Sequence, residues 1–294
     1  MCSLLSGILT NKMKRKHASS NDKCETNADY MAWIGMDNRD TVCGAASFEG
    51  NIWLANRFHI EFLDMNRPYE PHFEPVAGVI SMEIMPDKPN QCIALQKNGW
   101  MNFLRSNHQT SRCVQRLYFG DRMPYKVVTD PNYASFVFLL TTKGIVKYDL
   151  VNLCEDSFIP VKREVRTCDI LNKRQLIFHD EDKLKIWDSR QSKYALQITH
   201  KPLDDVYCFS RKESQLYIGK GTDGIDILDL KANKIRQWSP LPSYGLCVKD
   251  NVIVSCDRTC AYSFENVPHT YLKSHFPNCI RVTSIHKNTV VILG

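Results

Sequence analysis

Six short runs of alternating apolar and polar residues recur along the chain, at 58–64, 99–104, 144–149, 183–188, 224–229 and 260–264. A large apolar residue ends or nearly ends each run, at intervals of 41, 44, 39, 41 and 36 residues: Leu63, Leu104, Tyr148, Trp187, Leu228 and Phe264. Alternation with period two predicts β-strands. A period near 40 with several strands per unit is typical of a β-propeller, whose units bury their faces by stacking. The pattern therefore predicts an all-β repeat protein.

Strand-like segments follow one another from residue 29 onward, separated by turn signals at 49–51, 97–99, 130–132 and 223–224. The sequence contains no amphipathic helix of useful length. Residues 1–28 are polar over most of their length, and we expect them to form a largely flexible N-terminal segment. Residues 29–294 are then a single domain.

The spacing of the runs also predicts how the domain closes. A seventh run would fall after the last residue of the sequence, so the last unit lacks strands. Residues 280–285 and 289–293 supply two strands, 30–34 an outer strand and 3–9 a possible third. We therefore expect a single propeller of seven four-stranded blades, closed by pairing of N- and C-terminal strands, with six blades as the alternative.

Residues 29–294 resemble a diverged WD-repeat propeller, most clearly at 176–229. The Trp187-Asp188 ending is typical of that family, as is the order of His200, an inner strand at 206–209, a second strand at 216–219 and Asp223 in the turn. The resemblance implies that His200 and Asp223 form a structural hydrogen bond. The phase of the repeat implies that Trp187 is buried between blades.

The formal net charge is +6, and much of the excess lies in one block that contains Lys12, Lys14, Arg15 and Lys16. This block is typical of a nuclear import signal, and also of a phosphate contact or a solubilising tail. The 12 cysteines include no Cys-x-x-Cys pair, which favours a reducing, intracellular location in nucleus, cytoplasm or both. No apolar run is long enough to span a membrane.

The sequence contains no strong motif for catalysis, cofactor binding or metal binding. Residues 219–224 match the glycine pattern of a dinucleotide loop, but a strand-like run follows where that motif requires a helix, so a hairpin turn is favoured. A zinc site would need Cys256 and Cys260 to meet His269 and His275 from a separate loop. We therefore predict no catalytic, cofactor-binding or metal-binding residue and no enzymatic activity. An enzyme with a site in the central channel would need converging carboxylates or histidines.

These observations favour an interaction scaffold within a multisubunit protein complex. The run Trp187-Asp188-Ser189-Arg190 resembles the Trp-Asp-x-Arg signature of substrate receptors that dock on the adaptor of cullin-type ubiquitin ligases. That resemblance implies that Asp188 and Arg190 bind a partner. A second alternative is an RNA- or chromatin-associated propeller, which would gather basic residues such as Arg112, Arg116, Lys162 and Arg163 on one surface.

Overall fold

The computed structural model describes residues 32–35, 43–46, 51–64, 72–85, 88–107, 110–129, 133, 135–191, 195–197, 203, 205–249, 252–257, 260–265, 271–275, 281–286 and 289–293. Among these residues every element is a strand, apart from a short 3-10 helix η1 at Gly120–Arg122. No helix in the described part has the length and hydropathy needed to span a bilayer. The all-β prediction is confirmed.

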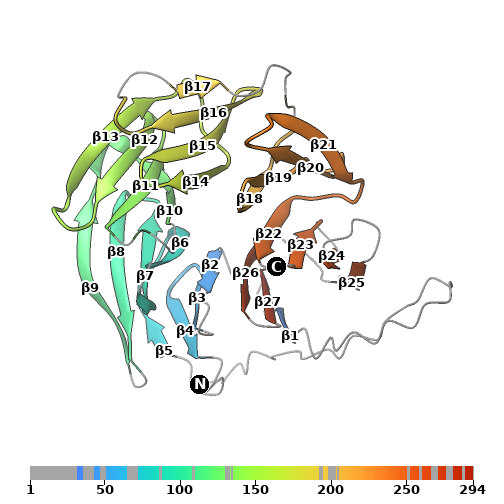
Figure 1. The fold of residues 1–294 in the computed structure, drawn as a ribbon. Helices are drawn as coiled ribbons and strands as arrows, with labels where there is room; N and C mark the ends of the chain where they lie inside the picture. The colour runs from blue at the N-terminus through green and yellow to red at the C-terminus, as the bar shows by residue number, and fades with distance from the viewer. Residues whose placement is uncertain are drawn as a thin grey trace. The chain divides into compact units, whose positions relative to one another are not determined.

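The chain divides into two compact units, Asp40–Phe209 and Met1–Arg39 together with Ser210–Gly294. The first unit contains four antiparallel sheets, each of four strands in chain order (Figure 1). Its strands are β2 (Cys43–Ala46), β3 (Asn51–Ala55), β4 (Ile60–Asp64), β5 (His72–Glu74), β6 (Val79–Met85), β7 (Lys88–Gln96), β8 (Trp100–Ser106), β9 (Ser111–Tyr118), β10 (Pro124–Val128), β11 (Phe136–Thr141), β12 (Gly144–Asp149), β13 (Cys154–Pro160), β14 (Cys168–Asn172), β15 (Gln175–Asp180), β16 (Lys183–Asp188) and β17 (Ala195–Gln197).

The second unit contains two more four-stranded sheets and one three-stranded sheet among the described residues. The unit boundary falls within the strand β18. The strands are β18 (Cys208–Lys212), β19 (Gln215–Gly219), β20 (Ile225–Asp229), β21 (Lys234–Ser239), β22 (Gly245–Lys249), β23 (Val252–Cys256), β24 (Cys260–Glu265), β25 (Tyr271–His275), β26 (Arg281–His286), β27 (Thr289–Leu293) and β1 (Ala32–Gly35).

The six runs predicted from the sequence are β4, β8, β12, β16, β20 and β24, the third strand of each four-stranded sheet. The repeat of about 40 residues is therefore a repeat of whole sheets. The two predicted C-terminal strands correspond to β26 and β27.

Aspartates at the ends of third strands hold the following turns. The Asp149 Oδ1 atom accepts hydrogen bonds from the amides of Val151 and Asn152, at 2.7 and 3.0 Å. The Asp229 Oδ1 atom accepts from the amides of Lys231 and Ala232 at 2.8 and 3.0 Å. These bonds lower the pKa of both carboxyl groups. The aspartates that end β12 and β20 are therefore turn-forming residues.

Glycines at the starts of two third strands are required by the backbone. Gly144 and Gly224 both have positive φ angles, of 154° and 91°. A Cβ atom at Gly144 would collide with the carbonyl oxygen of Ile159, and one at Gly224 with that of Ser239. Each glycine thus lets the fourth strand of its sheet approach the third.

Neighbouring sheets meet through their first strands. In the unit Asp40–Phe209, β6 lies against β2 and β10, and β10 lies against β14; in the other unit, β22 lies against β26. The same hydrogen bond recurs in both units: the amide of Val127 donates to Ser81 Oγ (3.2 Å), and the amide of Val248 to Ser210 Oγ (2.8 Å). Successive sheets are therefore joined in the same way in each unit.

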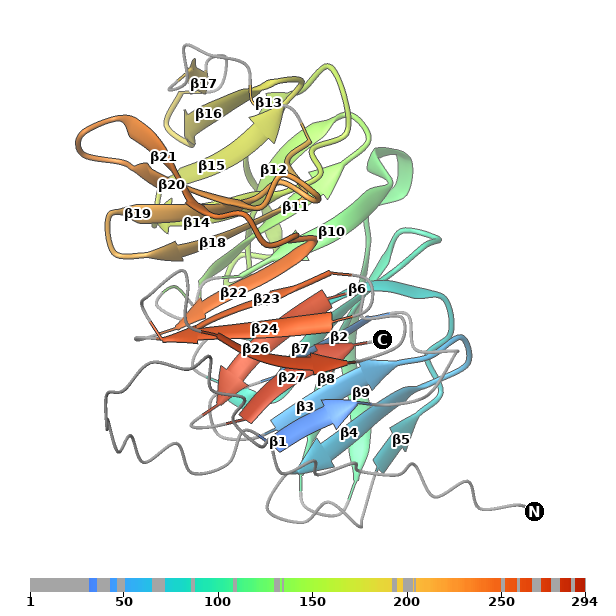
Figure 2. The same ribbon diagram turned by 90° about the vertical axis from the view of Figure 1, so that its right-hand side faces the viewer.

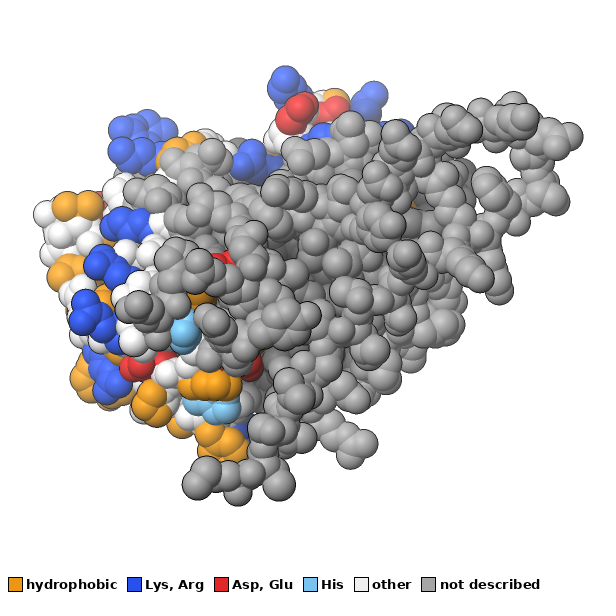
Figure 3. All heavy atoms as spheres, turned by 90° about the horizontal axis from the view of Figure 1, so that it is seen from below, with side chains coloured by type: hydrophobic (Ala, Val, Ile, Leu, Met, Phe, Trp, Pro, Cys, Tyr) orange, Lys and Arg blue, Asp and Glu red, His pale blue; other side chains and the backbone are white. Residues whose placement is uncertain are grey.

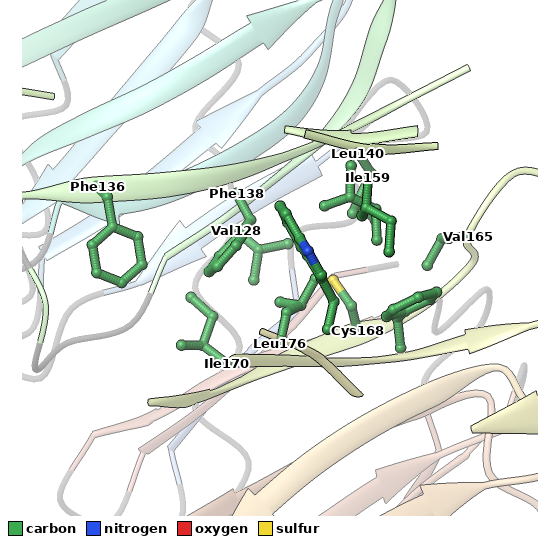
Figure 4. Close-up of a cluster of buried hydrophobic side chains, with 12 residues drawn as sticks. Val128, Phe136, Phe138, Leu140, Ile159, Val165, Cys168, Ile170 and Leu176 are labelled. Atoms are coloured by element: carbon green, nitrogen blue, oxygen red, sulfur yellow. The ribbon is translucent and has the colours of Figure 1, made fainter. Parts of the chain in front are cut away.

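Apolar side chains fill the space between successive sheets. Figure 4 shows one such cluster, with Val128, Phe136 and Phe138 from one sheet and Ile170 and Leu176 from the next. Trp187 belongs to this cluster and is fully buried, with its ring centroid 5.9 Å from that of Phe138. Within the unit Asp40–Phe209, each sheet thus covers an apolar face of its neighbour, as a repeat of this kind requires.

The predicted pairing between the two ends of the chain is present. The strand β1 pairs with β27 in parallel, with Ala32 opposite Thr289 and Gly35 opposite Ile292. Figure 2 shows β1 beside β27 and β26. Residues 3–9, the other candidate strand for this sheet, lie outside the described part of the chain.

Candidate partner-binding surfaces

Arg190 is held by Asp188 in the turn that follows β16. The Nε and Nη2 atoms of Arg190 donate to the two carboxylate oxygens of Asp188 at 2.9 and 2.6 Å, and its amide donates to Asp188 Oδ1 at 3.1 Å. The guanidinium keeps the pKa of Asp188 well below its usual range. The Arg190 side chain is nonetheless 63% exposed. A bidentate pair of this kind fixes the direction of a cation that solvent can still reach.

Two further hydrogen bonds hold the backbone beneath this pair. Trp187 donates from Nε1 to the carbonyl oxygen of Gln191 at 2.9 Å, and the amide of Ser189 donates to the carbonyl oxygen of Arg174 at 2.7 Å. The latter bond recurs at the same place in two other sheets, from Leu150 to Ser135 and from Leu230 to Ser214, both at 2.8 Å. These three turns are therefore built alike.

The exposed side chain differs from one of these turns to the next. The position two residues after the aspartate holds Val151, Arg190 and Lys231 in the three turns, and Val151 is 74% exposed. Leu153, in the same turn as Val151, is 42% exposed. The fold thus presents an apolar and two basic side chains from turns that share the same hydrogen bonds.

The predicted structural pair His200 and Asp223 stays a prediction, because His200 lies outside the described residues. Asp223 is exposed, and its amide donates to the carbonyl oxygen of Lys220 at 3.1 Å. The glycine-rich segment around it joins β19 to β20 as a turn, and Gly221 pairs with Ser243. No helix follows this segment, so it lacks the helix N-terminus of a dinucleotide site.

Other predicted residues also lie partly outside the described part of the chain. The basic residues Lys12, Lys14, Arg15 and Lys16 do so, and so does His269 of the zinc hypothesis. Cys256 is described and buried. Within the described residues, no group of three or more His, Cys, Asp or Glu side chains is arranged to hold a metal.

The basic residues considered for nucleic acid occupy two places. Arg112 and Arg116 lie on β9, the outer strand of its sheet, while Lys162 and Arg163 lie in the connection between β13 and β14. All four are exposed. Figure 3 shows Lys and Arg side chains lying among hydrophobic ones on the described part of one face.

Two exposed aromatic residues on the same face of the sheet as Arg116 were not predicted from the sequence. Trp100 on β8 is 38% exposed and Tyr118 on β9 is 60% exposed, with ring centroids 5.1 Å apart. A compositional signal was available, because residues 88–120 contain no Asp or Glu. The pairing of the two rings, in contrast, depends on the strand register.

Two titratable groups with shifted pKa values, His179 and Tyr125, form hydrogen bonds with the backbone. Burial lowers the pKa of His179, whose Nε2 atom is 2.8 Å from the carbonyl oxygen of Leu203. Burial also raises the pKa of Tyr125, whose hydroxyl bridges to the backbone of Val165. Each of these groups bonds to backbone at a connection between sheets.

Neither the protein-family models nor the curated proteins compared with this sequence include a match.

Proposed function

We propose that the chain is a non-enzymatic scaffold that binds other proteins through a seven-bladed WD-like propeller. The observation that carries the proposal is the set of three equivalent turns, which share their backbone hydrogen bonds but project Val151, Arg190 and Lys231. A rigid framework with variable exposed side chains suits the binding of several partners. Catalysis would require converging reactive groups rather than separate exposed ones.

The seven-bladed arrangement is supported by features of each unit. Sheets of one design follow one another, and serines on first strands accept the same hydrogen bond from the next sheet in both units. The parallel pairing of β1 with β27 joins the ends of the chain within one sheet. Closure in this manner protects strand edges that would otherwise invite aggregation.

We propose that Arg190 contacts an acidic group of a partner protein. Its guanidinium is held in place by Asp188 before any partner binds, so little side-chain entropy is lost on binding. A ubiquitin-ligase adaptor is the second candidate, on the basis of the Trp-Asp-x-Arg resemblance. The exposed apolar residues Val151 and Leu153 on the equivalent turn of the preceding sheet favour it, because the core of a protein interface is depleted of charge.

A matched pair of charge reversals tests the role of Arg190. Arg190→Glu and Lys231→Glu change equivalent positions of two turns, and both variants should remain folded. Arg190→Glu should have the lower melting temperature of the two, because it removes the ion pair with Asp188. We expect Arg190→Glu to reduce recovery of a specific set of partners by roughly tenfold or more, through loss of charge-assisted bonds and new repulsion. Quantitative mass spectrometry of material purified from the native cell measures this.

Lys231→Glu should leave the same set of partners in place. Loss of a ligase adaptor with Arg190→Glu would support the second candidate. Unchanged partner recovery with Arg190→Glu, or equal loss with both variants, would exclude Arg190 as the contact.

A further inference from the structure

Four exposed apolar side chains lie at one end of the sheets in the unit Asp40–Phe209. They include Phe58, which is 72% exposed, and Met123, which is 44% exposed. Phe58 lies in the turn before the third strand β4. The ring pair of Trp100 and Tyr118 lies where β8 begins and β9 ends, and Met123 follows in the connection to β10. This is therefore the end of the unit at which third strands begin.

Local contacts hold the segments that carry these side chains. The Asn56 Oδ1 atom accepts from the amides of Phe58 and of the residue after it, at 2.8 Å each. Such bonds are typical of a turn that asparagine stabilises. A Cβ atom at Gly99 or Gly120 would lie 3.6 or 3.5 Å from the Tyr118 ring, so that ring rests on glycine backbone.

Hydrogen bonds join this end of the sheet β2–β5 to that of the sheet β6–β9. The carbonyl oxygen of Arg57 accepts from the amide of Gly78 at 3.4 Å, and that of Gly78 accepts from the amide of Lys97 at 2.9 Å. The Gln96 Nε2 atom donates to the carbonyl oxygen of Ala77 at 2.6 Å. The β3–β4 turn and the β7–β8 turn therefore lie side by side.

The sheet β10–β13, which follows in chain order (Figure 1), belongs to the same surface. The amide of Phe119 donates to the carbonyl oxygen of Gly99 at 3.1 Å, and Thr142 Oγ1 donates to that of Arg122 at 3.4 Å. The connection from β9 to β10 therefore lies between the β7–β8 turn and the β11–β12 turn. The strand β13 ends opposite the start of β12, so the connection from β13 to β14 lies at this end too.

The surface that these segments form is strongly basic. We call it the turn surface and define it by residues 56–59, 75–78, 97–100, 118–123, 142–143 and 161–166. It contains seven Lys or Arg residues and two Asp or Glu residues. The side chains of Lys97, Lys143, Lys162 and Arg163 are exposed and form no hydrogen bond or ion pair with another described residue. A surface of one sign attracts an anionic partner.

Separate apolar side chains among cations suit the interface of an anionic membrane. Lipid adapts to the shape of such side chains, Trp and Tyr are enriched at the level of the headgroups, and Lys and Arg are attracted to anionic lipids. The polar atoms of the Trp100 and Tyr118 side chains form no hydrogen bond with other described residues, so headgroups can bind them. A single-stranded nucleic acid would use the rings and the cations, but Met123 offers it no ring on which a base could stack.

We propose that the turn surface binds membranes that contain anionic lipids. Phe58, Trp100, Tyr118 and Met123 enter the interface, and the surrounding Lys and Arg side chains face the headgroups. The Arg190 turn follows the end of a third strand, whereas the turn surface lies where third strands begin. This inference therefore goes beyond the proposed function and does not depend on it.

Co-sedimentation with phosphatidylcholine vesicles, with and without phosphatidylserine, tests the proposal. The full chain is used with Lys12, Lys14, Arg15 and Lys16 changed to Gln, so that this separate basic block contributes nothing. We expect binding that requires phosphatidylserine and that weakens as salt is added, because salt screens the attraction between the cations and the lipid headgroups.

One pair of double variants measures the apolar contribution. Phe58→Ala with Met123→Ala should weaken vesicle binding by roughly tenfold or more, because two apolar side chains no longer enter the interface. Val114→Ala with Ile235→Ala removes exposed apolar atoms from the outer strands β9 and β21, and should leave binding unchanged. Thermal melts confirm that both double variants are folded.

A second pair measures the charge contribution. Lys97→Gln with Lys143→Gln should weaken binding by about fivefold for each charge removed, since a cation near an anionic surface contributes about 1 kcal/mol. Lys88→Gln with Arg112→Gln makes the same change in net charge near the other end of the sheet β6–β9. These control changes should have a much smaller effect.

Three results would overturn the proposal. One is the absence of binding to phosphatidylserine vesicles at low salt, and another is an equal effect of the turn-surface variants and their controls. The third is full displacement of the vesicles by an oligouridylate whose own affinity is the same for Phe58→Ala with Met123→Ala as for the unmodified surface. That result would assign the turn surface to a single-stranded nucleic acid instead.

Discussion

At the scale of single residues, the aspartates that end third strands have two separable roles. Asp149, Asp188 and Asp229 each accept an amide hydrogen bond in the following turn, but only Asp188 also holds an arginine side chain. An asparagine keeps the oxygen that accepts from the amide and removes the charge. Substitution by asparagine therefore removes the ion pair but keeps the hydrogen bond that holds the turn.

Asp188→Asn should lower the free energy of unfolding at pH 7 relative to the wild type. The pKa of Asp188 is lowered in the folded state by Arg190, so the charged carboxylate stabilises the fold above its unfolded pKa of about 3.9. This contribution is lost as the pH falls below about 4 toward the folded pKa. Urea unfolding from pH 7 to pH 3 should show the difference between wild type and variant shrinking. A difference between wild type and Asp188→Asn that stays constant from pH 7 to pH 3 would contradict the ion-pair model.

At the scale of the element, the third strand depends on its first residue. Gly144 begins β12 with a positive φ and lies directly beside the Ile159 carbonyl oxygen on β13. The pairing of β12 with β13 continues from Gly144 to Asp149. A side chain at this position would push the outer strand away from the sheet.

Gly144→Ala should cost about 2 to 4 kcal/mol of unfolding free energy, as a combined backbone and steric effect. Gly78→Ala provides the control, because Gly78 also has a positive φ but has open space around its Cα. Its cost should be only the backbone term, roughly 1 to 2 kcal/mol. Denaturant titration measures both, and equal costs would show that Ile159 is not the obstacle.

The strands could be predicted from the sequence because the third strands alternate, and because β12, β16 and β20 begin or end on a residue with a local role. Gly144 and Asp149 are examples, since a turn residue acts on its own neighbours. The candidate partner-binding surfaces could be predicted from the sequence only in part, unlike the strands. That Arg105 faces Arg112, and Trp100 faces Tyr118, depends on a register that includes an irregularity between Phe103 and Leu104. Periodicity places residues on faces of one strand but does not align two strands across such a shift.

At the scale of the whole molecule, the proposed propeller requires that β1 and β27, near the two ends of the sequence, pair with each other. Deletion of residues 284–294 removes β27 and half of β26 and leaves β1 without its partner. The truncated protein should lose its cooperative melting transition. In a closed repeat the sheets stabilise one another, so disruption of the sheet that closes the repeat destabilises all of them. Deletion of residues 1–28, which leaves β1 intact, should preserve the transition. A native melting curve for the C-terminal deletion would refute closure.

The parallel pairing of β1 with β27 also sets an order of events during synthesis. The strand β1 precedes β27 by about 250 residues, so it leaves the ribosome well before its partner does. At translation rates of about 5 to 20 residues per second, β1 waits on the order of 10 s or longer before its partner exists. Until then the edge of β1 that β27 covers is available to other strands, so we expect the incomplete chain to aggregate more readily than the finished one.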